Sequence, residues 1–169
     1  MFKEIAAKDI QGNPFRMIAD EWMLAAVGNR EKYNMMTASW GFFGEMWNRQ
    51  TAVTVIRPVR YTYELMENND YFSLSFYGDN RKIHDVCGSK SGRNVDKAKE
   101  AGLTPVFSDN TVYFEEARLV LICKKIYAGV VDPLLFLEPA IDKLYPKKDY
   151  HKAYVGEIIK TLIKDGYDK

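Results

Sequence analysis

The sequence of 169 residues is poor in cysteine and histidine, with two of each. Cys87 and Cys123 form no C-x-x-C pair, so neither a disulfide framework nor a zinc site is indicated. No stretch approaches the roughly 18 apolar residues of a membrane-spanning helix, and the first residues lack the apolar run of a signal peptide. We therefore expect a cytoplasmic protein without a metal site and without a membrane partner.

A strong charge of either sign is also missing. The 24 basic and 23 acidic residues leave a formal net charge of +1, which gives no global field to recruit nucleic acid. The P-loop pattern G-x-x-x-x-G-K-[ST] and the fingerprint G-x-G-x-x-G are absent. Any anion site must therefore be local, and a nicotinamide nucleotide would have to bind without a Rossmann domain.

The composition favours one β-rich domain. A hydrophobic content of 47% can bury one sizeable core, and an aromatic content of 14% suits β-strands or a planar ligand. Strand-like runs outnumber helical ones, and no repeat or low-complexity tract appears. We predict a mainly β (α+β) barrel in which residues 1–169 form a single domain, with six to eight strands and three short helices.

Two hydroxyls mark the predicted strand 34–43. Successive side chains of a strand point to opposite faces, so Thr37 and Ser39 should share one face, together with Met35 and Gly41. They could bind a ligand, or they could simply face solvent. The spacing alone does not decide between these two interpretations.

The next predicted strand, 51–56, leads into a helix that we expect to begin at Pro58. Free N–H groups at a helix start, with Arg57 and Arg60 beside them, could bind a phosphate. An arginine at the end of a strand is also a common surface residue. The local pattern therefore indicates an anion site without excluding the simpler explanation.

A second candidate anion site lies at residues 87–94, after a predicted strand at 71–77 and a short helix at 81–86. It combines two glycines and two serines with Lys90 and Arg93. Glycines let backbone N–H groups converge and the cations supply charge, as a phosphate cradle needs. A solvated basic turn has the same composition. A short helix capped by Asn94 and stopped by Gly102 should follow.

The remainder of the chain predicts two strands or one bent strand over 111–127, a proline-containing loop, and a closing strand or tail over 158–169. His151 lies between aromatic residues after this loop. A lone histidine in such a place is more often structural than catalytic, although it could also line a site.

Five sequence blocks contain most of these features, in a fixed order: residues 34–41, 55–64, 87–97, 101–105 and 150–158. Together they resemble the flavin reductase-like family of FMN-binding split barrels, over a stretch from Trp22 to Ile158. The resemblance implies a Greek-key split β-barrel that forms a homodimer, with FMN near the subunit interface. FMN also combines a phosphate dianion with a planar ring, which suits two separate clusters of donors.

The resemblance also assigns residues. Those expected to hold the flavin are Thr37, Ala38, Ser39 and Trp40, with Arg57, Arg60, Tyr61 and Thr62 close by. The phosphate would be neutralised by Lys90, Ser91 and Arg93, and His151 would line the exposed face of the flavin as a candidate catalytic residue.

The implied activity is hydride transfer from NAD(P)H to flavin, which either ends with the reduced flavin or passes the electrons on to a partner protein. An alternative is an FMN electron carrier that is reduced by another protein and not by a nicotinamide. A third alternative, from a different class, is a cofactor-free barrel whose aromatic strands stack on single-stranded nucleic acid. The net charge of +1 argues against that last alternative.

Overall fold

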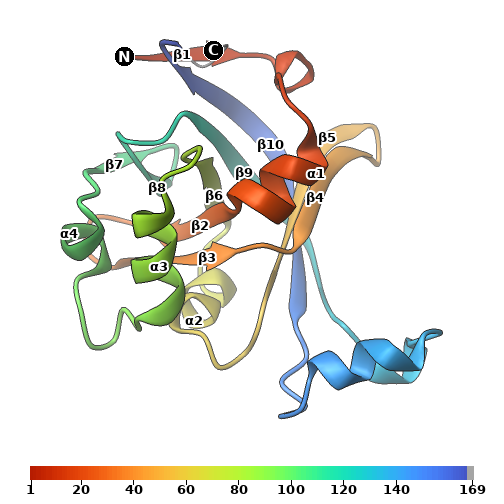
Figure 1. The fold of residues 1–169 in the computed structure, drawn as a ribbon. Helices are drawn as coiled ribbons and strands as arrows, with labels where there is room; N and C mark the ends of the chain where they lie inside the picture. Colours follow the sequence, from red (N-terminus) through yellow and green to blue (C-terminus); the bar gives the residue numbers. More distant parts are fainter. Residues whose placement is uncertain (167–169) are drawn as a thin grey trace.

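The computed structural model describes residues 1–166 and consists mainly of β-strands (Figure 1). The strands are β1 (Phe2–Ile5), β2 (Met23–Gly28), β3 (Tyr33–Ala38), β4 (Gly41–Met46), β5 (Arg49–Ile56), β6 (Tyr71–Phe76), β7 (Pro105–Ser108), β8 (Thr111–Phe114), β9 (Leu119–Val130) and β10 (Lys152–Lys164). The α-helices are α1 (Pro14–Arg16), α2 (Tyr61–Glu67), α3 (Arg81–Ser89) and α4 (Lys97–Ala101). A π-helical turn at Met17–Glu21 continues α1, and short 3-10 helices lie at Ala7–Asp9, Pro133–Leu135 and Pro139–Leu144.

Eight strands form one antiparallel sheet in the order β3-β2-β6-β9-β10-β5-β4, with β1 added beside β10. The strands β7 and β8 form a separate hairpin. β2 and β3 form a hairpin, and the predicted segment 111–127 divides into β8 and the start of β9. The mainly β fold class predicted from the sequence is confirmed.

The core has two parts, one on each face of the sheet, because successive strand residues point to opposite sides. Inside the barrel lie Phe72, Leu74 and Phe76 of β6, together with the buried face of α2. On the other side α3, α4 and the β7–β8 hairpin cover the sheet. All six residues of β2 are buried, since both of its faces are covered.

The predicted strand 34–43 is broken in two. β3 ends at Ala38, Ser39 and Trp40 lie outside any strand, and β4 begins at Gly41. A Cβ at Gly41 would lie 2.2 Å from the carbonyl oxygen of Val53, so only glycine lets β4 approach β5 at this bend. The prediction that one strand face carries Thr37, Ser39 and Gly41 is therefore wrong.

Two predicted helix starts also need correction. α2 begins at Tyr61 and not at Pro58, because Arg57 to Arg60 form a turn in which the N–H of Arg60 donates to the carbonyl of Arg57 at 3.0 Å. The cap of α4 is Asp96 and not Asn94, since the Asp96 carboxylate accepts from the N–H of Lys99 at 3.1 Å.

The helix predicted over 81–86 also continues further, so that the first three residues of the predicted loop 87–94 belong to α3. The predicted stop of α4 at Gly102 is confirmed, with the left-handed backbone that favours glycine there.

Residues 131–151, here called the arm, connect β9 to β10 and extend away from the barrel, in blue at the lower right of Figure 1. The arm carries two of the 3-10 helices, Pro133–Leu135 and Pro139–Leu144. The closing strand β10 begins at Lys152, earlier than predicted, and the last residues of the predicted segment 158–169 lie outside the described residues. Within residues 1–166 no helix is long and apolar enough to cross a membrane.

Candidate functional site

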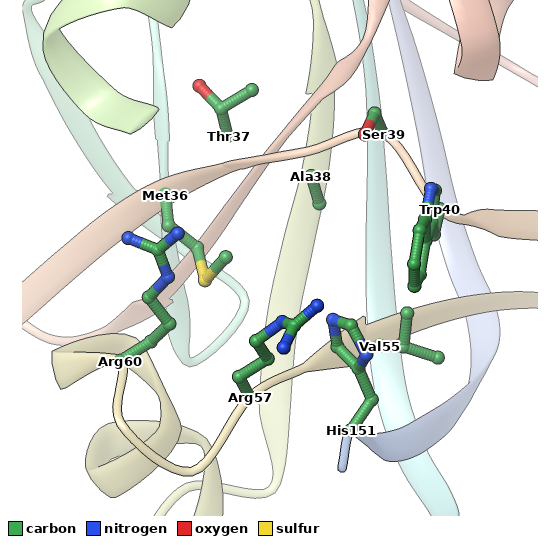
Figure 2. Close-up of a pocket in the computed structure, with 9 residues that line it drawn as sticks. All are labelled: Met36, Thr37, Ala38, Ser39, Trp40, Val55, Arg57, Arg60 and His151. Carbon is green, nitrogen blue, oxygen red and sulfur yellow. The ribbon is translucent and has the colours of Figure 1, made fainter. Parts of the chain in front are cut away.

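A cavity of about 230 Å³, here called the ring cavity, lies where β3 ends beside the ends of β5 and the arm (Figure 2). Met36 and Val55 line the cavity with apolar side chains. The other lining residues are seven of the twelve predicted from the sequence, namely Thr37, Ala38, Ser39, Trp40, Arg57, Arg60 and His151.

The sheet explains why these distant residues meet. Lys152, the first residue of β10, pairs with Ile56, the last residue of the antiparallel strand β5. His151 and Arg57 therefore lie next to each other, just beyond the same end of these two strands. The Trp40 ring lies 5.1 Å from the His151 ring, which brings the bend after β3 to this edge. The lining of the cavity therefore combines apolar and aromatic side chains with cations and an imidazole.

A smaller cavity of about 100 Å³, here called the anion cavity, adjoins the ring cavity and shares Met36 and Arg60 with it. Four more predicted residues line it: Tyr61, Thr62, Lys90 and Ser91. The start of α2 and the loop after α3 supply them. The two regions that the sequence indicated as separate anion sites therefore form one site.

Gly92 lets this loop approach β3. A Cβ added to Gly92 would lie 2.1 Å from Oδ1 of Asn34, a buried residue whose amide donates to the Thr62 hydroxyl at 2.9 Å. A larger residue would clash with Asn34 and force the loop away from β3. The glycine therefore shapes the cradle by close approach and not by an unusual backbone angle.

Lys97 is a buried cation of the anion cavity that the sequence reasoning missed. Its Nζ donates to the carbonyls of Met35 at 2.6 Å and of Cys87 at 2.8 Å. Burial, and then the charge of Arg60, lower the pKa of this ammonium. An ammonium group has three protons, so one is left over for a ligand. The one signal in the sequence was its place at the end of the block 87–97.

Two predicted phosphate ligands are paired within the protein. Lys90 lines the anion cavity and forms an ion pair with Glu100. Arg93 lines neither cavity, because its guanidinium pairs with Glu64 and lies 4.8 Å from the centre of the Tyr61 ring. The structure thus brings Lys90 to the site and keeps Arg93 beside it.

The hydroxyl of Thr37 is directed at α3. It donates to the carbonyl of His84 at 3.1 Å and lies 3.2 Å from Nδ1 of the same residue. Figure 2 shows Thr37 pointing away from Arg57 and His151, whereas Met36 points toward them. Thr37 therefore lies at the ring cavity but uses its hydroxyl to attach α3 to β3.

Arg57 attaches the arm to the ring cavity. Its guanidinium donates to Asp149 at 2.7 Å and to the carbonyl of Leu144 at 3.0 Å, and it lies 4.7 Å from the centre of the Tyr145 ring. The Tyr145 hydroxyl is 2.8 Å from Nδ1 of His151. Burial, followed by the charge of Arg57, lowers the pKa of His151 to about 4, so this imidazole is neutral at pH 7.

A groove of about 410 Å³ continues the ring cavity on the far side of Trp40. Its walls are mostly apolar and come from α1, the turn after it and β4, with Phe15 and Phe42 among them. The ring cavity therefore opens onto a surface suited to a flat apolar molecule.

The sequence profile of the flavin reductase like domain matches residues 16–167. The chain belongs to the flavin reductase-like family. The match includes both cavities and the arm, and it confirms the family that the five blocks resemble. A comparison with curated proteins finds no match.

Solved structures place the flavin reductase-like chain in the split-barrel fold. Flavoredoxin of Desulfovibrio vulgaris is 21% identical over 85% of this chain and 69% of its own, with a TM-score of 0.66. An FMN-binding protein from Thermus thermophilus is 20% identical over 98% and 84%, with a TM-score of 0.69. A Shewanella frigidimarina protein with a split barrel domain is 16% identical over 90% and 73%, with a TM-score of 0.67.

Proposed function

We propose that this chain binds FMN across the two cavities and transfers hydride from NAD(P)H to flavin. The observation that carries the proposal is the pairing of a ring cavity, whose lining combines apolar and aromatic side chains with polar ones, and an adjoining anion cavity that contains cations and hydroxyls. FMN has a planar ring and a phosphate, and the two cavities match these two parts. The family membership and the FMN-binding neighbour support the same cofactor.

The residues of the anion cavity suit a phosphate. Lys97 and Arg60 are cations without a carboxylate partner among the hydrogen bonds of residues 1–166, and Ser91 adds a hydroxyl. Charge-assisted hydrogen bonds from such groups are about twice as strong as neutral ones. We assign the phosphate to this cavity, with Lys90 and Tyr61 at its rim and Thr62 held by Asn34.

In the ring cavity the chain would orient and shield the flavin. Ala38 and Met36 offer apolar contact, Ser39 lies at the bend, and Trp40 is 42% exposed beside the cavity. FMN, when bound, would supply the ring nitrogen that accepts a hydride. His151 packs beside Trp40, and both it and Arg57 line the cavity, where they can contact a nicotinamide placed against the flavin ring.

The test is a visible spectrum of the purified protein with FMN, recorded anaerobically before and after adding NADH or NADPH. We expect the flavin absorbance to bleach with at least one nicotinamide. Failure of both nicotinamides to bleach bound flavin would refute the reductase activity while leaving FMN binding intact. A protein that takes up no FMN would refute the whole proposal.

A second candidate function keeps the FMN but not the nicotinamide. The similarity to flavoredoxins, at 21% and 22% identity, fits an electron carrier that exchanges electrons with a partner protein. The same anaerobic experiment decides between them, because a carrier would be reduced by dithionite but not by NADH or NADPH. A cytoplasmic location and a single domain over residues 1–169 are part of both proposals.

We also infer a homodimer in which the arm contributes to the interface. Leu134 is 90% exposed, Leu135 is 74% exposed and Leu137 is 99% exposed. Clustered apolar side chains of this kind are typical of interaction sites. Because Arg57 and Tyr145 fix the base of the arm to the ring cavity, association through the arm would also stabilise the cavity.

A further inference from the structure

The two nitrogens of the His151 imidazole differ in their hydrogen bonding. Nδ1 is 2.8 Å from the hydroxyl oxygen of Tyr145, whose side chain is buried. Within residues 1–166 no side chain is hydrogen-bonded to the other nitrogen, Nε2, and His151 lines the cavity. Which nitrogen carries the proton therefore decides what the cavity offers to a ligand.

Counting protons settles the direction of the Tyr145–His151 hydrogen bond. Burial raises the pKa of the Tyr145 phenol, so the phenol keeps its one proton at neutral pH. No acceptor for this proton other than Nδ1 is found among the described residues. If Nδ1 carried a proton itself, the buried phenol proton would have no partner, which would cost free energy. Nδ1 is therefore the acceptor, and the imidazole proton lies on Nε2.

The charges around His151 keep the ring neutral. Arg57 and Arg60 act on it from the turn after β5, and Asp149 acts on it from the arm. Asp149 is already paired with Arg57 at 2.7 Å, which weakens its pull on a second cation. The neighbouring aromatic residues, Trp40 and Tyr145, add no charge that would favour an imidazolium.

We propose that Tyr145 is a positioning residue that fixes His151 as a neutral imidazole and directs its Nε2–H into the ring cavity, as a donor to a carbonyl oxygen bound there. Both the flavin ring and the nicotinamide carboxamide carry such an oxygen. The proposal deepens the proposed function, on which the identity of the carbonyl rests. The proton on Nε2 does not depend on FMN and can be observed without it.

Nitrogen NMR of the labelled protein without flavin tests the tautomer directly, because protonated and unprotonated ring nitrogens have well separated chemical shifts. The chain has two histidines, and His84→Asn assigns their signals. At pH 7 we expect His151 to show a protonated Nε2 and an unprotonated Nδ1. A protonated Nδ1, or a doubly protonated ring, would overturn the proposal.

Tyr145→Phe tests whether the tyrosine is the cause. The variant keeps the ring under Arg57 but removes the donor to Nδ1, so we expect a mixture of tautomers. Tyr150→Phe is the matched control, because the Tyr150 hydroxyl donates to Asp142 and not to His151. An unchanged tautomer in Tyr145→Phe would refute the positioning role. If Tyr145→Phe does not fold, the tautomer of the wild-type protein still decides the proposal.

Titration with FMN and then NADH separates this proposal from the proposed function. A change in the Nε2 signal on addition of FMN identifies a flavin carbonyl as the acceptor, and a change only on NADH addition identifies the carboxamide. A protein that binds both molecules without any change at Nε2 would refute the donor role of His151. A protein that binds neither would refute the proposed function, and the tautomer would still be judged from the unliganded spectrum.

Discussion

Replacing Lys97 by methionine should show whether the anion cavity binds a phosphate. Methionine keeps most of the length and apolar character of the lysine stem but removes the ammonium group. That group is buried and donates to two carbonyls at 2.6 and 2.8 Å, which fixes its position at the cavity wall. The loss of FMN affinity should therefore come from removing a charge at a fixed position and not from altering a flexible surface side chain.

The magnitude follows from one charge-assisted hydrogen bond. Such a bond contributes about 1.5–3 kcal/mol, so FMN affinity should fall about 10- to 150-fold. Riboflavin has the same ring but no phosphate, and its affinity should change by less than about twofold. Comparing the two flavins isolates the contribution of the phosphate.

Quenching of flavin fluorescence measures both affinities. Lys99→Met is the matched control, since Lys99 lies on the same short helix and is exposed. A melting curve for each variant ensures that folded protein is compared. Equal losses for FMN and riboflavin, or no loss for FMN, would refute the assignment of the phosphate to this cavity.

Three further predictions concern the loop, the histidine and the arm. Gly92→Ala should lower FMN affinity and cost about 1–3 kcal/mol of unfolding free energy by overpacking. Gly44→Ala, whose added Cβ meets nothing within 4 Å, is its control, and equal behaviour of the two would contradict the cradle. His151 has a pKa of about 4 in the folded protein, against an ordinary value of 6.5. As the pH falls, the unfolded chain therefore binds a proton at this histidine before the folded chain does, and the folded state loses stability from about pH 6.5 downward. Between pH 7 and pH 5 the contribution of His151 to this loss should reach about 2 kcal/mol in urea unfolding. His151→Phe should therefore lose less stability than the wild type by about that amount, with only the contribution of His84, whose pKa is also lowered by burial, left among the histidines. An equal loss in the variant would contradict the reasoning. Leu134→Asp combined with Leu137→Asp should give a monomer in light scattering if the arm forms the dimer, and an unchanged mass would exclude the arm.

Local patterns predicted most of the strands correctly. The alternation in β6 and the β-branched run of β5 reflect burial on a sheet, and both were found at nearly the expected residues. Boundaries were less accurate, as at Pro58, where a turn precedes the helix. The break after Ala38 could not be predicted, because it depends on the close approach of Gly41 to Val53 of another strand.

The sequence predicted which residues gather at the site but not which contacts they make there. The family resemblance gave twelve site residues, and all of them except Arg93 line one cavity or the other. Lys97 was missed because burial of a lysine in a short polar helix leaves no pattern in the sequence. Thr37 was chosen for its hydroxyl, although that hydroxyl bonds to His84 of α3.

The sequence by itself determined the family, the mainly β fold and the types of group that gather at the site, because these depend on local periodicity and on five ordered blocks. Only the tertiary structure decided which cations remain available to a ligand, since Glu64 and Glu100 pair with Arg93 and Lys90 across loops that are distant in sequence. It alone placed Tyr145 behind His151. A hydrogen bond depends on the position and direction of two atoms, and the folded chain fixes both.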